Sequence, residues 1–159
     1  MIFIAVGTQK FQLNRLLKQI DELIESKQIT EKVFAQIGNS DYKPVNYEYT
    51  DFLNKEEFDK YVGHCDVLIT HSGVGTIISG LNQKTPVIVY PRLAKYNEHV
   101  DDHQLQIAGS FSMQNLVLLC GEKDDLNKLI QKARSHKFSV YRSQRENVIK
   151  KVRSFLNSI

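Results

Sequence analysis

The chain has 159 residues, of which 42% are hydrophobic and 25% are charged, which suits one globular domain and leaves no room for a second. The 21 Lys and Arg residues exceed the 18 Asp and Glu residues by only three, which argues against wholesale nucleic-acid binding. No apolar run approaches the roughly 20 residues that span a bilayer, and the first residues lack the pattern of a signal peptide, so we expect a soluble, cytoplasmic protein.

Apolar runs of strand length recur along the chain and alternate with stretches of helical spacing. The strand-like runs cover residues 2–6, 33–37, 67–70, 87–90 and 116–120, with a weaker alternating run around residues 47–53. Between them, residues 13–24 and 126–133 place apolar side chains on one helical face. This alternation predicts a parallel sheet of about six strands with helices on both faces. We therefore expect an α/β, Rossmann-like fold, as a single domain over residues 1–159.

Local signals add detail at the start of one helix, at the two cysteines and near the last residue. Asn54 and Glu57 have the spacing of a capping box. Cys65 and Cys120 lie far apart without CxxC spacing, so we expect buried thiols rather than a disulfide or a zinc site. An apolar stripe predicts a last helix that packs back over the sheet, and it consists of Val148, Val152, Phe155, Leu156 and Ile159.

The turns that follow the predicted strands are the places to look for a ligand, because open parallel sheets bind ligands beyond the carboxyl ends of their strands. In chain order these turns are Gly7-Thr8, Gly38-Asn39-Ser40, residues 71–76 and Pro91-Arg92. Glycine, hydroxyl and other small residues dominate three of the four turns. Such turns let backbone N–H groups approach phosphate oxygens at helix N-termini.

The turn at residues 71–76 runs from an apolar strand through Gly73 and Gly75 into a helix that we expect to begin near Thr76. It is not a Walker loop, because no Gly-Lys-Ser/Thr follows, and it lacks the third glycine of the dinucleotide fingerprint. An anion-binding turn and a purely structural turn both remain open at this point, since each needs glycine.

A second polar constellation covers residues 91–104, directly after a predicted strand. His99 and His103 have the i, i+4 spacing of a metal pair, but Val100 stands where a zincin has its glutamate, so we favour hydrogen bonding to sugar or phosphate over a metal. The alternative is a solvated helix start with Glu98 and Asp102 near the positive dipole end. Arg92 is a candidate cation for a phosphate, or else a surface residue.

Five motifs in this order resemble the glycosyltransferase family 28 C-terminal domain over nearly the whole chain. They are Val6-Gly7-Thr8, Gln36-Ile37-Gly38, residues 70–76, residues 86–92 and residues 98–104. Within the family, the chain is most similar to small stand-alone members, such as the catalytic subunit of the dolichol-linked N-acetylglucosaminyltransferase and bacterial capsule and exopolysaccharide galactosyltransferase subunits.

The resemblance implies the donor-binding half of a GT-B enzyme, with a UDP-sugar as ligand. It places Gly7 and Thr8 around the diphosphate and Gly38 beside the nucleoside. It also places His71, Ser72, Gly73, Gly75 and Thr76 around the diphosphate, and Asp102, His103 and Gln104 against the sugar, with Glu98 and Arg92 in the same binding region. One departure is Ser79, which stands where larger relatives have a ribose-binding glutamate, so ribose recognition is expected to be weaker or supplied elsewhere.

The expected function is the donor-binding, catalytic subunit of a two-component glycosyltransferase that moves galactose or N-acetylglucosamine from a UDP-sugar to a lipid-linked acceptor in polysaccharide biosynthesis. The sequence contains no Asp-x-Asp motif, so we expect neither a metal nor a cofactor. One domain cannot form a GT-B cleft, which implies a membrane-associated acceptor subunit that also brings the chain to the membrane.

Three alternatives accompany this expectation. The first is a non-catalytic nucleotide-binding regulatory subunit, against which the retained Glu98, Asp102, His103 and Gln104 argue. The second is a nicotinamide or flavodoxin-like module, which the incomplete glycine fingerprint disfavours. The third concerns assembly, since homo-oligomers would cover the partner surface when the partner is absent.

Overall fold

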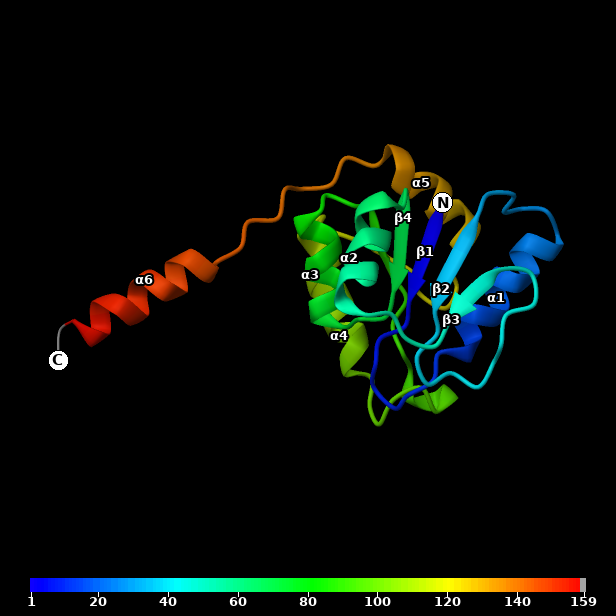
Figure 1. The fold of residues 1–159 in the computed structure, drawn as a ribbon, viewed down its shortest axis with the longest axis horizontal. Helices are drawn as coiled ribbons and strands as arrows, with labels where there is room; N and C mark the ends of the chain where they lie inside the picture. Colours follow the sequence, from blue (N-terminus) through cyan, green and yellow to red (C-terminus); the bar gives the residue numbers. More distant parts are fainter. Residues whose placement is uncertain (158–159) are drawn as a thin grey trace.

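The computed structural model describes residues 1–157, in which six parallel strands form one sheet of order β3-β2-β1-β4-β5-β6 (Figure 1). The strands are β1 (Ile2–Ala5), β2 (Val33–Gln36), β3 (Glu48–Thr50), β4 (Val67–Thr70), β5 (Val87–Val89) and β6 (Leu118–Leu119). The helices are α1 (Asn14–Glu25), α2 (Lys55–His64), α3 (Val74–Asn82), α4 (His103–Met113), α5 (Leu126–Ser135) and α6 (Arg145–Leu156), with a 3₁₀ turn η1 (Ala94–Tyr96). This order confirms the predicted Rossmann-like α/β fold.

The sheet is covered on both faces because successive side chains of the central strand β1 point to opposite sides. Ile2 and Ile4 belong to a core cluster with apolar residues of α1 and α5. Phe3 and Ala5 belong to a second cluster with residues of α2, α3 and α4. All four residues of β1 are buried, as a strand packed on both faces requires.

Local signals in the sequence account for several element boundaries. Asn54 forms the predicted capping box of α2, because its side chain accepts from the Glu57 amide at 2.9 Å while the Glu57 carboxylate accepts from the Asn54 amide at 3.3 Å. Cys65 and Cys120 are buried free thiols, as expected. Burial raises the pKa of each thiol to about 12, so both are poor nucleophiles at neutral pH.

The last helix differs from the prediction that it packs over the sheet. Residues 136–144 carry α6 away from the sheet and its covering helices (Figure 1). The predicted stripe is exposed in the described residues, with 56% of Val148 and 51% of Val152 accessible, and Ile159 lies outside the described residues. The physical reason is that α1 to α5 already cover both faces, so no apolar sheet surface remains for α6.

Within residues 1–157, helices of 12 residues such as α1 and α6 are too short and too polar to cross a lipid bilayer.

Candidate functional site

The candidate site lies where the strand order reverses, between β1 and β4. Ala5 pairs with Thr70 at the carboxyl ends of these neighbouring strands, so the turns that follow them, residues 6–9 and residues 71–73, start side by side. We call these two segments the switch-point turns. In open α/β sheets this reversal leaves room for a ligand, because the connections on its two sides lead to opposite faces.

The glycines of the switch-point turns are required by close packing against His71. Gly7 has a φ of +83° and Gly38, in the turn after β2, has a φ of +58°, both in the left-handed region that favours glycine. A Cβ atom at Gly7 or Gly73 would overlap the His71 ring, and one at Gly38 would overlap the Gly7 carbonyl oxygen. Gly75 differs, because a Cβ atom there would meet nothing within 4 Å.

His71 is buried with its ring edge between the two glycine turns, and it is only 6% exposed. Its Nδ1 lies 3.2 Å from Thr70 Oγ1, and this hydroxyl donates to the Ala5 carbonyl at 2.6 Å. Burial, reinforced by the nearby Arg92 charge, lowers the pKa of His71 to about 3. The imidazole is therefore neutral at physiological pH.

Helix α3 begins at the switch-point turns without a side-chain cap hydrogen bond at its N-cap residue. Its first residue is Val74, two residues before the predicted start, and its N-cap is Gly73, which makes no side-chain cap hydrogen bond. The first N–H groups of a helix lack partners within the helix, so they are available to an acceptor that approaches along the axis. Just before the helix, the buried Ser72 hydroxyl has no hydrogen-bond partner among residues 1–157.

Arg92 is buried, so the alternative of a surface residue is wrong, and its role as a cation for a phosphate stays a prediction. Its side chain is fully buried, and Nη2 donates to the carbonyls of Val6 at 2.5 Å and Phe11 at 3.0 Å. Nε donates to Gln12 at 3.3 Å, which leaves buried Nη1 without a partner in the described part of the chain. Burial lowers the pKa of Arg92 to about 10, which still leaves it charged. Arg92 therefore clamps the loop after β1 and keeps one donor free.

Gln104 and Asp102, expected against a sugar, also make contacts within the protein. Gln104 Oε1 accepts from the Ser72 amide at 3.3 Å and from the Arg92 amide at 3.1 Å, which ties the turn after β4 to the turn after β5. Asp102 Oδ1 accepts from the Ala94 amide at 2.8 Å. His103 opens α4 and is exposed.

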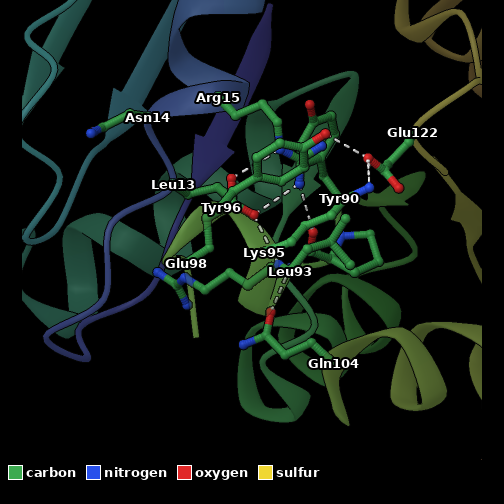
Figure 2. Close-up of polar contacts among 12 residues, drawn as sticks. Leu13, Asn14, Arg15, Tyr90, Leu93, Lys95, Tyr96, Glu98, Gln104 and Glu122 are labelled. Atoms are coloured by element: carbon green, nitrogen blue, oxygen red, sulfur yellow. Dashed lines mark hydrogen bonds and ion pairs between the residues drawn. The ribbon is translucent and has the colours of Figure 1, made fainter. Parts of the chain in front are cut away.

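Glu98 is held in a buried ion pair with Arg15, a residue that the sequence analysis did not single out (Figure 2). Arg15 Nε and Nη2 donate to the two Glu98 oxygens at 2.9 Å each, and Glu98 Oε2 also accepts from the Leu93 amide at 2.9 Å. The guanidinium packs between the rings of Tyr90 and Tyr96. Both carboxylate oxygens are thus engaged within the protein, and Glu98 anchors the loop after β5 to α1. Its expected place in the binding region stays a prediction.

Thr8 belongs to the switch-point turns, and Gly38 lies in the neighbouring turn after β2. Thr8 is exposed, and the Asn39 side chain donates to the Gln9 carbonyl at 2.9 Å, so the turn after β2 is bound to the turn after β1. Three consecutive turns of the sheet, after β2, β1 and β4, therefore meet around Gly7.

The two histidines with i, i+4 spacing do not share a helical face. His99 precedes α4 and its ring packs on Phe11 at a centroid distance of 4.5 Å, whereas His103 is the first residue of α4. Within residues 1–157, no three His, Cys, Asp or Glu side chains are grouped closely enough to hold a metal ion.

A cavity of about 590 Å³ lies at the opposite end of the sheet from these turns. Residues that precede β2 and β3 line it, including Lys27, Thr30 and Lys32. This is the amino-terminal edge of parallel strands, where ligands of such sheets are not found. We therefore place the candidate site at the switch-point turns and not at this cavity.

Solved structures with the same arrangement are GT-B glycosyltransferases. The glycosyltransferase of kitacinnamycin superposes with a TM-score of 0.65 at 18% identity, over 85% of this chain and 35% of that one. MurG of Acinetobacter baumannii superposes with a TM-score of 0.53 at 16% identity, over 85% of this chain and 45% of that one. The chain thus has the fold of one half of such an enzyme.

The sequence comparison identifies the family. The model of the glycosyltransferase family 28 C-terminal domain matches residues 1–159, and the chain belongs to this family. A curated relative is the UDP-N-acetylglucosamine transferase subunit ALG13 of Candida albicans, 31% identical over 86 residues, which are 54% of this chain and 26% of that protein. The matched region spans about a quarter of the length of this relative.

Proposed function

We propose that this chain is the donor-binding, catalytic subunit of a two-component glycosyltransferase. It transfers galactose or N-acetylglucosamine from a UDP-sugar to a lipid-linked acceptor, which a membrane-associated partner subunit holds. The observation that carries this proposal is the set of unpaired donors at the switch-point turns, which comprises the uncapped N-terminus of α3, the Ser72 hydroxyl and Arg92 Nη1.

These donors suit a diphosphate, because an anion at a helix N-terminus is stabilised by backbone N–H groups and by the helix dipole. A UDP leaving group develops negative charge as the sugar departs, and donors fixed in place before the reaction stabilise that charge without a divalent ion. The open side of Gly75 adds space for a phosphate next to the α3 backbone.

A partner subunit is proposed on geometric grounds. Residues 1–157 supply one sheet and one set of carboxyl-edge turns, whereas a GT-B active site lies between two such halves. The name of the Candida albicans relative, a transferase subunit, is consistent with an enzyme of more than one chain. In this proposal the acceptor half brings the general base, and the partner holds this chain at the membrane.

A non-catalytic nucleotide-binding subunit is the second candidate. The expectation against it drew on Glu98, Asp102, His103 and Gln104. Three of these side chains bind loops of the protein itself, and His103 alone of the four is exposed without such a contact among residues 1–157. Their presence therefore no longer favours a working sugar site over a nucleotide site alone. Transfer activity with the acceptor subunit separates the two candidates.

Titration calorimetry tests the donor site. We expect UDP, UDP-galactose and UDP-N-acetylglucosamine to bind in the presence of a chelator, and ADP to bind more weakly. We also expect His103→Ala to weaken UDP-sugar binding more than UDP binding, by on the order of 0.5–1.5 kcal/mol, if this exposed residue meets the sugar. Binding that strictly requires magnesium or manganese would contradict the metal-free site.

A further inference from the structure

The hydrogen positions in the Thr70–His71 pair follow from the chemistry of their neighbours. The Thr70 hydroxyl has one hydrogen, and the Ala5 carbonyl 2.6 Å away can only accept, so the hydrogen points to Ala5. The hydroxyl oxygen then faces His71 Nδ1, at 3.2 Å, with a lone pair. Nδ1 must therefore carry the proton of the neutral imidazole.

This tautomer leaves a lone pair on Nε2, at the edge of the ring that lies between Gly7 and Gly73. The other unpaired groups around the switch-point turns are donors, from α3, Ser72 and Arg92. A diphosphate drawn to those donors would bring its own lone pairs to Nε2, which disfavours binding unless a proton lies between them.

Two changes could place a proton on Nε2. One is full protonation of His71, which burial and the positive charge of Arg92 both oppose. The other keeps the ring neutral: Nδ1 gives its proton to water, Nε2 takes one from water, and the Thr70 hydroxyl turns from Ala5 to donate to Nδ1. This second change gives up the Thr70–Ala5 and Nδ1–H···Thr70 hydrogen bonds, forms one from the Thr70 hydroxyl to Nδ1 and one from Nε2–H to the phosphate, and alters no net charge.

We propose that Thr70 is a positioning residue that sets which nitrogen of His71 carries the proton, and that it lets the ring switch from the Nδ1–H to the Nε2–H tautomer when UDP occupies the switch-point turns. The switch on UDP binding rests on the proposed function. The Nδ1–H tautomer of the protein without ligand does not depend on it. Thr70 is fully buried on β4 and reaches the ligand only through His71.

The experiment is nitrogen NMR of the histidine rings in the whole chain, without ligand and with saturating UDP. We expect His71 to show an Nδ1–H imidazole in the free protein and an Nε2–H imidazole in the complex. His64 serves as an internal reference, because its Nδ1 lies 2.7 Å from the Lys60 carbonyl on the exposed side of α2 and should not respond to UDP.

Two variants separate this role from a merely structural one. Thr70→Ser keeps the hydroxyl and should keep both the free tautomer and the switch. Thr70→Val keeps the shape but removes the acceptor for Nδ1–H, so free His71 should become a mixture of tautomers while the backbone spectrum stays dispersed. Wild-type tautomer behaviour in Thr70→Val would overturn the inference.

The outcomes with UDP distinguish this inference from the proposed function. If saturating UDP shifts no resonance near the switch-point turns, the donor site itself is wrong. If UDP binds there and His71 remains Nδ1–H, or carries protons on both nitrogens, the switch is wrong and the donor site stands.

Discussion

Gly73 and Gly75 lie two residues apart in the same turn, and they are expected to respond differently to a side chain. Gly75→Val should keep the stability of the protein and lose UDP affinity by about tenfold or more, because the new side chain meets open space where a phosphate would approach. Gly73→Val should unfold the turn, because its Cβ atom overlaps the His71 ring.

The measurements are thermal unfolding and UDP calorimetry on each variant. Gly109→Val is the matched control, because Gly109 in α4 also faces no atom within 4 Å but lies away from the switch-point turns. If Gly75→Val binds UDP as tightly as Gly109→Val does, the open side of α3 is not the phosphate site.

His71 makes the stability of the protein depend on pH. Its pKa is about 3 in the folded protein against an ordinary value of 6.5, so the unfolded chain takes up the proton first as the pH falls. Stability is therefore lost progressively as the pH drops below 6.5 toward 3, by about 2 kcal/mol at about pH 5. Above 6.5 this contribution is constant.

Urea unfolding at neutral pH and at about pH 5 measures this effect, with the His71→Gln variant expected to lack that part of the loss. His103→Gln is the control, because His103 is exposed and should leave the loss unchanged. If His71→Gln and the wild type lose the same stability on acidification, groups other than His71 account for that loss.

The loop after β5 is held to α1 by the Glu98–Arg15 pair, and removing one partner leaves a largely buried charge. Glu98→Ala should lower the free energy of unfolding by about 2–4 kcal/mol without any ligand. Glu122→Ala should cost far less, because its pair with Lys95 is exposed to solvent (Figure 2). Unchanged stability with weaker UDP-sugar binding in Glu98→Ala would contradict this prediction and would support a direct contact between Glu98 and the sugar.

Helix α6 lies apart from the sheet and should contribute little to its stability. A chain that ends after Ser143 should unfold within about 0.5 kcal/mol of the full chain, because the described side chains of residues 144–157 are exposed. Tyr141→Ala is the informative contrast, since Tyr141 packs against the core cluster of α2, α3 and α4 and should destabilise. Urea unfolding of the three proteins provides the comparison, and a large loss on truncation would show that α6 packs on the domain.

Periodicity in the sequence was enough to predict the strands and the faces of α1 and α5, because a two-faced sheet imposes an apolar pattern on each element. Periodicity was not enough to place α6, because an apolar stripe on a helix does not determine which surface packs against it. The roles of Glu98 and Gln104 were also out of reach. Polar residues after a strand can bind a ligand or a loop, and the partner of Glu98 lies 83 residues away in α1.

At the scale of the whole molecule, the proposed enzyme is incomplete without its acceptor half. The chain alone should bind UDP-sugar and transfer it slowly or not at all, because in-line positioning of the acceptor hydroxyl is worth several kcal/mol, roughly 7 or more in favourable cases. Adding the membrane-associated acceptor subunit should restore turnover with a lipid-linked acceptor. Robust transfer by the isolated chain would contradict the two-subunit proposal. If the chain binds UDP-sugar but no transfer occurs when the acceptor subunit and the lipid-linked acceptor are present, a regulatory subunit is favoured.

The overlap between His71 and a side chain at position 73 also restricts the order in which this turn can change during evolution. Gly73 has a negative φ of −71°, so a side chain is excluded there by the His71 ring rather than by the backbone. A small residue at position 71 would have to come first, and alanine at position 73 could then follow. The reverse order passes through a protein with a disrupted turn. Gly7 has no such route, because its positive φ persists whatever stands at position 71.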